Sequence, residues 1–125
     1  MKTNRTILII EDELALVNAL VDKFTLEKFS VITAENGEEG LKSAIKNHPD
    51  LILLDIVMPV MDGLTMLNEL VKDKWGKTAK VILLTNLSDP GKITDSVLKK
   101  VSGFMVKSDW RISDVVEEVK KKLAE

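Results

Sequence analysis

The chain has 125 residues, of which 45% are hydrophobic and 30% charged, and its formal net charge is −2. This balance predicts one globular domain over residues 1–125, with no basic surplus for direct nucleic-acid binding. The absence of cysteine excludes disulfides and thiolate zinc sites, and no apolar run is long enough for a membrane span or a signal peptide. We therefore expect a cytoplasmic protein that does not contact membranes.

The first third of the chain alternates strand-like and helix-like patterns. Residues 6–10 are apolar and β-branched, which predicts a buried strand. A helix follows, with an expected inward face of Leu14, Val17, Val21 and Phe24. A short strand over residues 31–34 precedes a second helix from Gly37 to His48. Its expected inward residues are Leu41, Ala44 and Ile45.

The most informative stretch is residues 51–63. Four apolar residues run into Asp55, between Pro49 and Pro59. Such an uninterrupted run is typical of a strand that is buried on both faces, as in a parallel sheet covered by helices. Asp55 then lies at the carboxyl end of this strand, where open α/β sheets bind their ligands.

The second half of the chain continues the alternation. Asp62 is the expected N-cap of a third helix, and residues 73–78 are an expected polar loop. Residues 80–84 predict a fourth strand that ends in Thr85. A fourth helix is expected to open at residues 88–90, and it should be the least stable helix because Gly91, Ile93, Thr94 and Val97 are poor helix formers.

A fifth strand over residues 103–106 ends in Lys107, and a last amphipathic helix follows. Its expected inward residues are Ile112, Val115, Val116, Val119 and Leu123. Five strands that alternate with five helices through short connections predict a parallel sheet with right-handed crossovers and helices on both faces.

Polar groups gather at the carboxyl ends of the predicted strands. They are Glu11, Asp12, Asp55, Thr85 and Lys107. If the first and third strands are neighbours, three carboxylates converge, and their repulsion requires a counter-charge. An oxygen-only ligand set without His or Cys favours Mg²⁺ (or Mn²⁺) over zinc. A carboxylate in such a site can also act as a nucleophile toward phosphorus.

These motifs resemble those of a response-regulator receiver domain, the phospho-acceptor module of two-component signalling. The resemblance covers the whole chain and rests on Glu11-Asp12, on Met58-Pro59 and Asp62-Gly63 after Asp55, on Thr85, and on residues 104–107. It implies a flavodoxin-like doubly wound five-stranded sheet of order 2-1-3-4-5 with five helices.

The resemblance also implies a role for each site residue. Asp55 would accept the phosphoryl group from a histidine kinase or a phosphotransfer protein. Asp12, Asp55 and the backbone carbonyl of Val57 would bind the metal, with Glu11 beside it. Thr85 and Lys107 would contact the phosphoryl oxygens.

A signalling switch follows from these roles, rather than an enzyme that acts on other substrates. The domain would catalyse only its own phosphotransfer and autodephosphorylation. Phe104 would turn inward as Thr85 moves toward the phosphate, and this would alter the surface formed by the fourth helix, fifth strand and fifth helix. The downstream target is unknown, and a weak homodimer is an open alternative.

Three positions depart from the common family pattern. Glu11 stands where many members have Asp, Asn86 stands where a small residue is usual, and Ser108 replaces the usual proline after Lys107. A cis bond before a non-proline residue costs about 2.5–4 kcal/mol. The Lys107–Ser108 bond is therefore either trans or held cis at this cost, and the direction in which the Lys107 side chain points is in question. We also expect a long-lived phosphoaspartate, because Val57 and Leu87 should flank the phosphoryl group and neither can hydrogen-bond an attacking water.

Three rival functions stay open at this point. Because of Asn86 and Ser108, the chain could also be a degenerate receiver that works as a phosphorylation-independent interaction module. An aspartyl phosphatase is disfavoured, since it would need an acid at the position of Val57. A flavin-binding protein is disfavoured too, because acidic residues 11–13 would repel a phosphate group that has no metal.

Overall fold

The computed structural model describes residues 5–85, 93–107 and 110–124. The strands are β1 (Thr6–Ile10), β2 (Ser30–Ala34), β3 (Leu51–Asp55), β4 (Val81–Thr85) and β5 (Gly103–Val106). The helices are α1 (Leu14–Leu26), α2 (Gly37–Asn47), α3 (Gly63–Leu70), α4 (Asp95–Leu98) and α5 (Ile112–Ala124), with a short 3-10 helix η1 (Gly76–Thr78).

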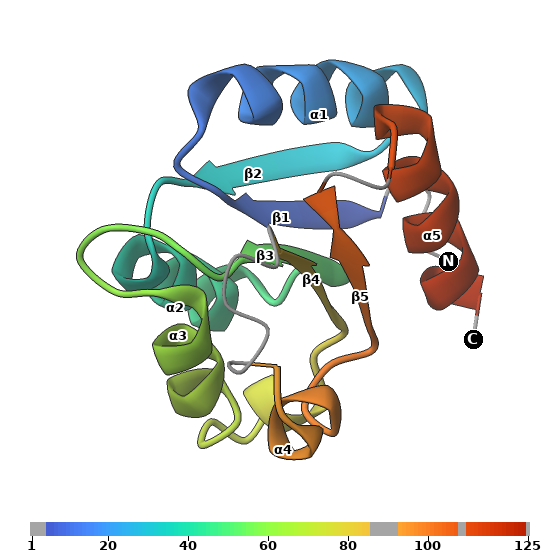
Figure 1. The fold of residues 1–125 in the computed structure, drawn as a ribbon. Coiled ribbons are helices and arrows are strands. Elements are labelled where there is room, and N and C mark those ends of the chain that lie inside the picture. The colour runs from blue at the N-terminus through green and yellow to red at the C-terminus, as the bar shows by residue number, and fades with distance from the viewer. Residues whose placement is uncertain (1–4, 86–92, 108–109, 125) are drawn as a thin grey trace.

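The five strands form one parallel sheet in the order β2-β1-β3-β4-β5 (Figure 1). The register pairs Ile10 of β1 with Ala34 of β2 and with Leu54 of β3, so the carboxyl ends of these three strands lie level. This is the flavodoxin-like topology that the resemblance implied, and the prediction is confirmed.

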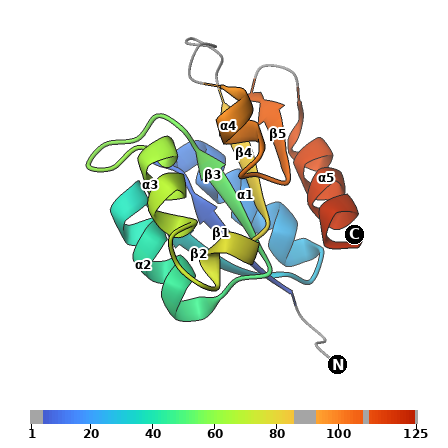
Figure 2. The same cartoon turned by 90° about the horizontal axis from the view of Figure 1, so that it is seen from below.

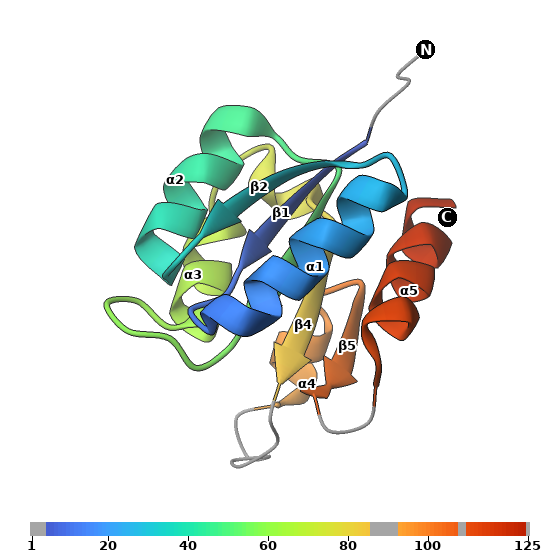
Figure 3. The ribbon, with the colours of Figure 1, turned by 90° about the horizontal axis from the view of Figure 1, so that it is seen from above.

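Helices cover both faces of the sheet. Figures 2 and 3 show α1 and α5 on one face and α2, α3 and α4 on the other. Alternate residues of β1 supply the two cores: Ile7 and Ile9 pack toward Phe24 of α1, whereas Leu8 and Ile10 pack toward the opposite helices. Because both faces are covered, β3 is fully buried, as its uninterrupted apolar run predicted.

Two helix faces differ from the pattern-based expectation. Leu14 is 71% exposed and Ile45 is 39% exposed, although both were predicted to point inward. Leu14 is the first residue of α1 and belongs to neither hydrophobic core, whereas Val17, Leu20 and Phe24 further along the helix are buried. Ile45 lies on α2 one residue after buried Ala44, which places it about 100° around the helix from the sheet-facing stripe.

The region of the fourth helix also differs. Within the described residues α4 comprises only Asp95–Leu98, and Ile93 and Thr94 lie outside it. The Thr94 side chain accepts a hydrogen bond from the Val97 N–H, so this residue caps the helix instead of continuing it. The expected opening at residues 88–90 lies outside the described residues. The expected loop over residues 73–78 contains the short helix η1.

Candidate functional site

The acidic residues converge at the carboxyl edge of the sheet. Asp55 is the last residue of β3, and Glu11 and Asp12 follow the neighbouring strand β1. Each of the three carboxylates offers an oxygen atom, and these atoms lie within 4.8 Å of one another. Glu11 and Asp55 are only 2% and 4% exposed, whereas Asp12 is exposed. The predicted convergence of the three acids is therefore present in the structure.

Lys107 neutralises part of this charge. Its Nζ lies 2.7 Å from Glu11 Oε1 and 3.4 Å from Asp55 Oδ1. Glu11 Oε2 also accepts a hydrogen bond from the Glu13 N–H at 3.0 Å. Lys107 follows β5, two strands away from β3, so only the folded sheet brings this cation to the acids. In this structure Lys107 is held more closely by Glu11 than by Asp55.

Burial and the nearby charge of Glu11 both disfavour the ionised form of Asp55. Burial raises the pKa of Asp55 to about 7, the charge of Glu11 adds to the rise, and Lys107 opposes it. For Lys107, burial lowers the pKa, but the contacts with Glu11 and Asp55 outweigh burial and raise the pKa above its usual value. One lysine is thus insufficient to keep the buried Asp55 carboxyl fully ionised at neutral pH.

The remaining predicted residues surround this cluster. Thr85 ends β4 beside β3 and is buried. Val57 lies in the loop after β3, two residues beyond Asp55, and is 63% exposed. Phe104 lies on β5, one strand further out, and is 41% exposed. The predictions about Asn86, Leu87 and Ser108 concern positions outside the described residues.

The loop after Asp55 requires a glycine at residue 63. The Gly63 N–H donates a hydrogen bond to the Ile56 carbonyl at 2.8 Å, and a Cβ at this position would lie 2.1 Å from the Asp55 carbonyl oxygen. The preceding Asp62 caps α3 by accepting from the Thr65 N–H at 2.8 Å. Asp62-Gly63 therefore folds the start of α3 closely against the backbone of Asp55.

A second glycine, which the sequence reading did not assign to the site, braces the same loop from α2. The Gly37 N–H donates to the Met61 carbonyl at 2.9 Å, and a Cβ on Gly37 would lie 2.4 Å from that oxygen. In the sequence Asn36-Gly37 signals only a turn. Its contact with the β3–α3 loop depends on the packing of α2 beside α3.

The cluster fits a hard divalent cation. Its donors are all carboxylate oxygens, two of them on nearly buried side chains, and the described residues supply one ammonium group against three acids. This donor chemistry suits Mg²⁺ better than a metal that prefers nitrogen or sulfur ligands. Glu11, Asp12 and Asp55 could each supply one oxygen ligand to such an ion.

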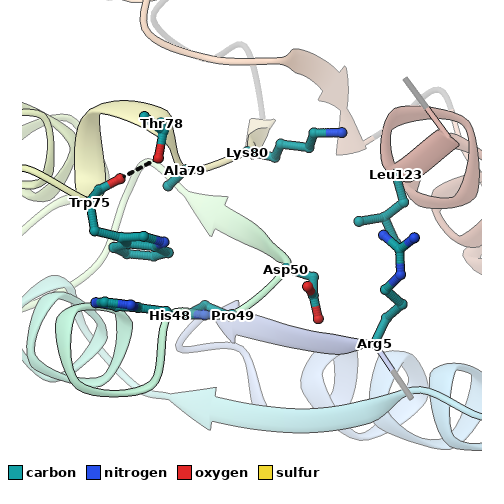
Figure 4. A pocket seen from close by; sticks show the side chains of 9 residues that line it. All are labelled: Arg5, His48, Pro49, Asp50, Trp75, Thr78, Ala79, Lys80 and Leu123. Carbon is teal, nitrogen blue, oxygen red and sulfur yellow. Dashed lines mark hydrogen bonds between the residues drawn. The ribbon is translucent and has the colours of Figure 1, made fainter. Parts of the chain in front are cut away.

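A different hollow lies at the amino ends of the strands (Figure 4). It has a volume of about 260 Å³ and lies between Arg5 and Trp75. The Trp75 ring stacks on the His48 ring, with centroids 4.4 Å apart and planes inclined by 8°. Asp50 accepts a hydrogen bond from the Thr6 N–H at 2.7 Å. Among the described residues that line the hollow, Asp50 alone is acidic, and the hollow lies at the edge of the sheet opposite to Asp55.

Comparison with known proteins agrees with this geometry. A family model described as the response regulator receiver domain matches residues 7–120. Over 115 residues the chain is 36% identical to YvfU of Bacillus subtilis, an uncharacterized transcriptional regulatory protein, and the match covers 90% of this chain and 56% of that protein. Over 101 residues it is 37% identical to the response regulator PleD of Caulobacter vibrioides, covering 81% of this chain and 22% of that protein.

A solved structure shares both the fold and the sequence pattern. The response regulator TrrA of Thermotoga maritima, whose crystal structure is a complex with Mg²⁺ and BeF, is 36% identical and has a TM-score of 0.81. The similarity covers 94% of this chain and 98% of that one. The chain spans about half the length of YvfU and less than a quarter of PleD. No helix in the described ranges is long and apolar enough to cross a membrane.

Proposed function

Because the chain belongs to the response regulator receiver family, we propose that Asp55 accepts a phosphoryl group from a histidine kinase or a phosphotransfer protein. The observation that supports this proposal most directly is the buried carboxylate of Asp55 within 4.8 Å of two further acids and beside Lys107. A carboxylate with this surrounding can attack phosphorus and form an acyl phosphate.

The proposed transfer exchanges one bond to phosphorus for another. A carboxylate oxygen of Asp55 forms the new O–P bond while the N–P bond of the donor phosphohistidine breaks. The bonding electrons stay with the imidazole nitrogen, which then takes up a proton. Lys107 and Thr85 hold the phosphoryl oxygens, and Lys107 must loosen its 2.7 Å contact with Glu11 to do so.

Asp12, Asp55 and the Val57 carbonyl are the proposed ligands of Mg²⁺ (or Mn²⁺). A bound dication would supply charge neutralisation for the phosphoryl oxygens. Glu11 would stay beside the ion because its Oε2 accepts a hydrogen bond from the Glu13 N–H. The domain would release its phosphate slowly by autodephosphorylation, since exposed Val57 offers no hydrogen bond to an attacking water.

The proposed switch links the phosphate to a distant surface. Phosphorylation adds charge and acceptor oxygens next to Thr85, which ends the strand beside β5. As Thr85 moves toward the phosphate, Phe104 turns inward from its 41% exposed position and alters the surface formed by α4, β5 and α5. The four-residue α4 has little cooperative stability of its own, which suits a population shift between two packings.

The direct test is intact-mass measurement after incubation with acetyl phosphate and magnesium. The wild-type protein should gain one phosphoryl group, and Asp55→Asn should gain none. Asp22→Asn is a matched control, because Asp22 is an exposed carboxylate on the surface of α1. If wild type is not labelled, or if Asp55→Asn is labelled equally, the proposed acceptor is wrong.

The same experiment separates the rival interaction module from the main proposal. A phosphorylation-independent receiver would show no mass gain after incubation with acetyl phosphate and magnesium. The complete acidic cluster with its paired lysine favours the phospho-acceptor reading, since an interaction module has no need for three converging acids at this edge.

A further inference from the structure

A groove lies beside the phospho-acceptor pocket, between the β1–α1 and β2–α2 connections. Figure 3 shows the ends of β1 and β2 and the first turn of α1 lying together at this edge of the sheet. The groove has a volume of about 310 Å³ and shares Glu11 and Asp12 with the acidic cluster. Any protein that delivers a phosphoryl group to Asp55 therefore comes close to this groove.

The floor of the groove is apolar. Val17 and Ala34 form buried parts of its lining, at 8% and 6% exposure. Leu14 stands at its edge and is 71% exposed, which is unusual for a leucine so near a core. Leu14 gains almost nothing from burial in the free protein, but it would gain from an apolar group laid into the groove.

The rim of the groove is acidic. Glu11 and Asp12 both belong to the acidic cluster of the proposed metal site, where a bound ion would neutralise their charge. Glu35 is different, because it lies outside the metal cluster at the end of β2. Its carboxylate has no ion-pair or hydrogen-bond partner in the described part of the chain. The charge of Glu35 therefore remains available when a metal is bound.

An apolar floor with a carboxylate at the rim matches a long aliphatic side chain with a cationic end. Arginine fits best, since its stem can lie on Leu14 and Val17 while its planar guanidinium pairs with the Glu35 carboxylate. Resting on the proposed function, we infer that this groove receives an arginine side chain that the phosphoryl-donor protein presents near its phosphohistidine. Glu35 and Leu14 would thus help the domain to select its donor.

Phosphohistidine peptides test this inference without knowledge of the donor. The peptides are alanine-rich helices with one phosphohistidine and an arginine three or four residues before or after it; matched peptides carry norleucine in place of arginine. Transfer to Asp55 is followed by intact mass at low salt with magnesium. For wild type, one arginine placement should transfer about two- to fivefold faster than its norleucine match, the range expected for an exposed ion pair. High salt should remove this advantage.

Variants of Glu35 test whether the faster transfer from arginine peptides depends on this carboxylate. Glu35→Gln should abolish the arginine advantage, and Glu35→Lys should make the arginine peptide transfer more slowly than its norleucine match. Glu38→Gln is the matched control and should keep the advantage, because Glu38 lies on α2 outside the groove, where it pairs with Lys42. Equal rates for all arginine and norleucine peptides with wild type, or an advantage that survives in Glu35→Gln, would overturn the inference. Acetyl phosphate labelling of wild type in parallel shows whether the phospho-acceptor proposal itself has failed.

Discussion

Replacing Asp55 with asparagine should stabilise the metal-free protein at pH 8. Asp55 is buried beside Glu11, and burial together with this repulsion raises its pKa from 3.8 to about 7. A difference of this size corresponds to about 4 kcal/mol, at about 1.4 kcal/mol per pKa unit. We expect a smaller gain of about 1–3 kcal/mol, because Lys107 loses one of its two partners in the variant.

The pH dependence has a definite sign. The folded-state pKa of Asp55 lies above the unfolded value, so the native protein binds the proton more tightly than the unfolded chain does. The contribution of this group to stability is present below pH 3.8 and is lost as the pH rises to about 7. The advantage of Asp55→Asn over wild type should therefore be small near pH 4, grow up to pH 7 and stay constant above it.

Urea unfolding with a chelator at several pH values measures this difference, and Asp22→Asn serves as the exposed control. Magnesium should reduce the advantage of Asp55→Asn, since the ion would stabilise wild type more than the variant. If Asp55→Asn is less stable than wild type at pH 8 without metal, or if its advantage does not shrink toward acid pH, the reasoning about desolvation and repulsion at this site is refuted.

Three further predictions concern the residues around Asp55, with Gly76 of η1 as a control outside this pocket. Magnesium at ten times its dissociation constant should stabilise wild type by about 1.4 kcal/mol in thermal unfolding, and Asp12→Asn should lose most of this gain; an equal gain in both proteins would contradict the assignment of Asp12 as a ligand. Gly63→Ala and Gly76→Ala should each destabilise the fold by about 1–3 kcal/mol, because the new Cβ would lie 2.1 Å from the Asp55 carbonyl oxygen or 2.0 Å from that of Leu70. Only Gly63→Ala should also weaken magnesium binding, as calorimetry can determine; unchanged affinity would separate the loop from the metal site. Val57→Asn should shorten the phosphoaspartate lifetime about two- to tenfold, the effect of one added hydrogen bond to water, and an unaltered decay of the phosphorylated mass would argue against this role.

The local sequence was sufficient for the strands and for the residues at their ends. An apolar run such as residues 51–54 has one stable environment, between two layers of helices, and Asp55 follows it directly. Since all strands are parallel, their carboxyl ends share one edge. The predicted acids at residues 11, 12 and 55 therefore had to lie near each other once β1 and β3 were neighbours.

The periodic pattern was less reliable at helix ends. Leu14 and Ile45 match the spacing of an inward face but are exposed, because the pattern records spacing along the helix and not where the helix meets the sheet. For the same reason the sequence did not reveal the Leu14 side of the groove, or the stacking of Trp75 on His48, which come from segments far apart in the chain.

By itself, the sequence determined the succession of strands and helices along the chain, the two-sided burial of β3 and the set of polar residues at one edge. Only the tertiary structure decided that Lys107 lies closer to Glu11 than to Asp55 and that Gly37 braces the β3–α3 loop. It also decided that the Glu35 carboxylate lines a groove without an ion-pair or hydrogen-bond partner among the described residues. The reason is physical: hydrophobic periodicity fixes which way a side chain points within its own element, whereas distances between side chains of different elements depend on register, packing and charge, which exist only in the assembled fold.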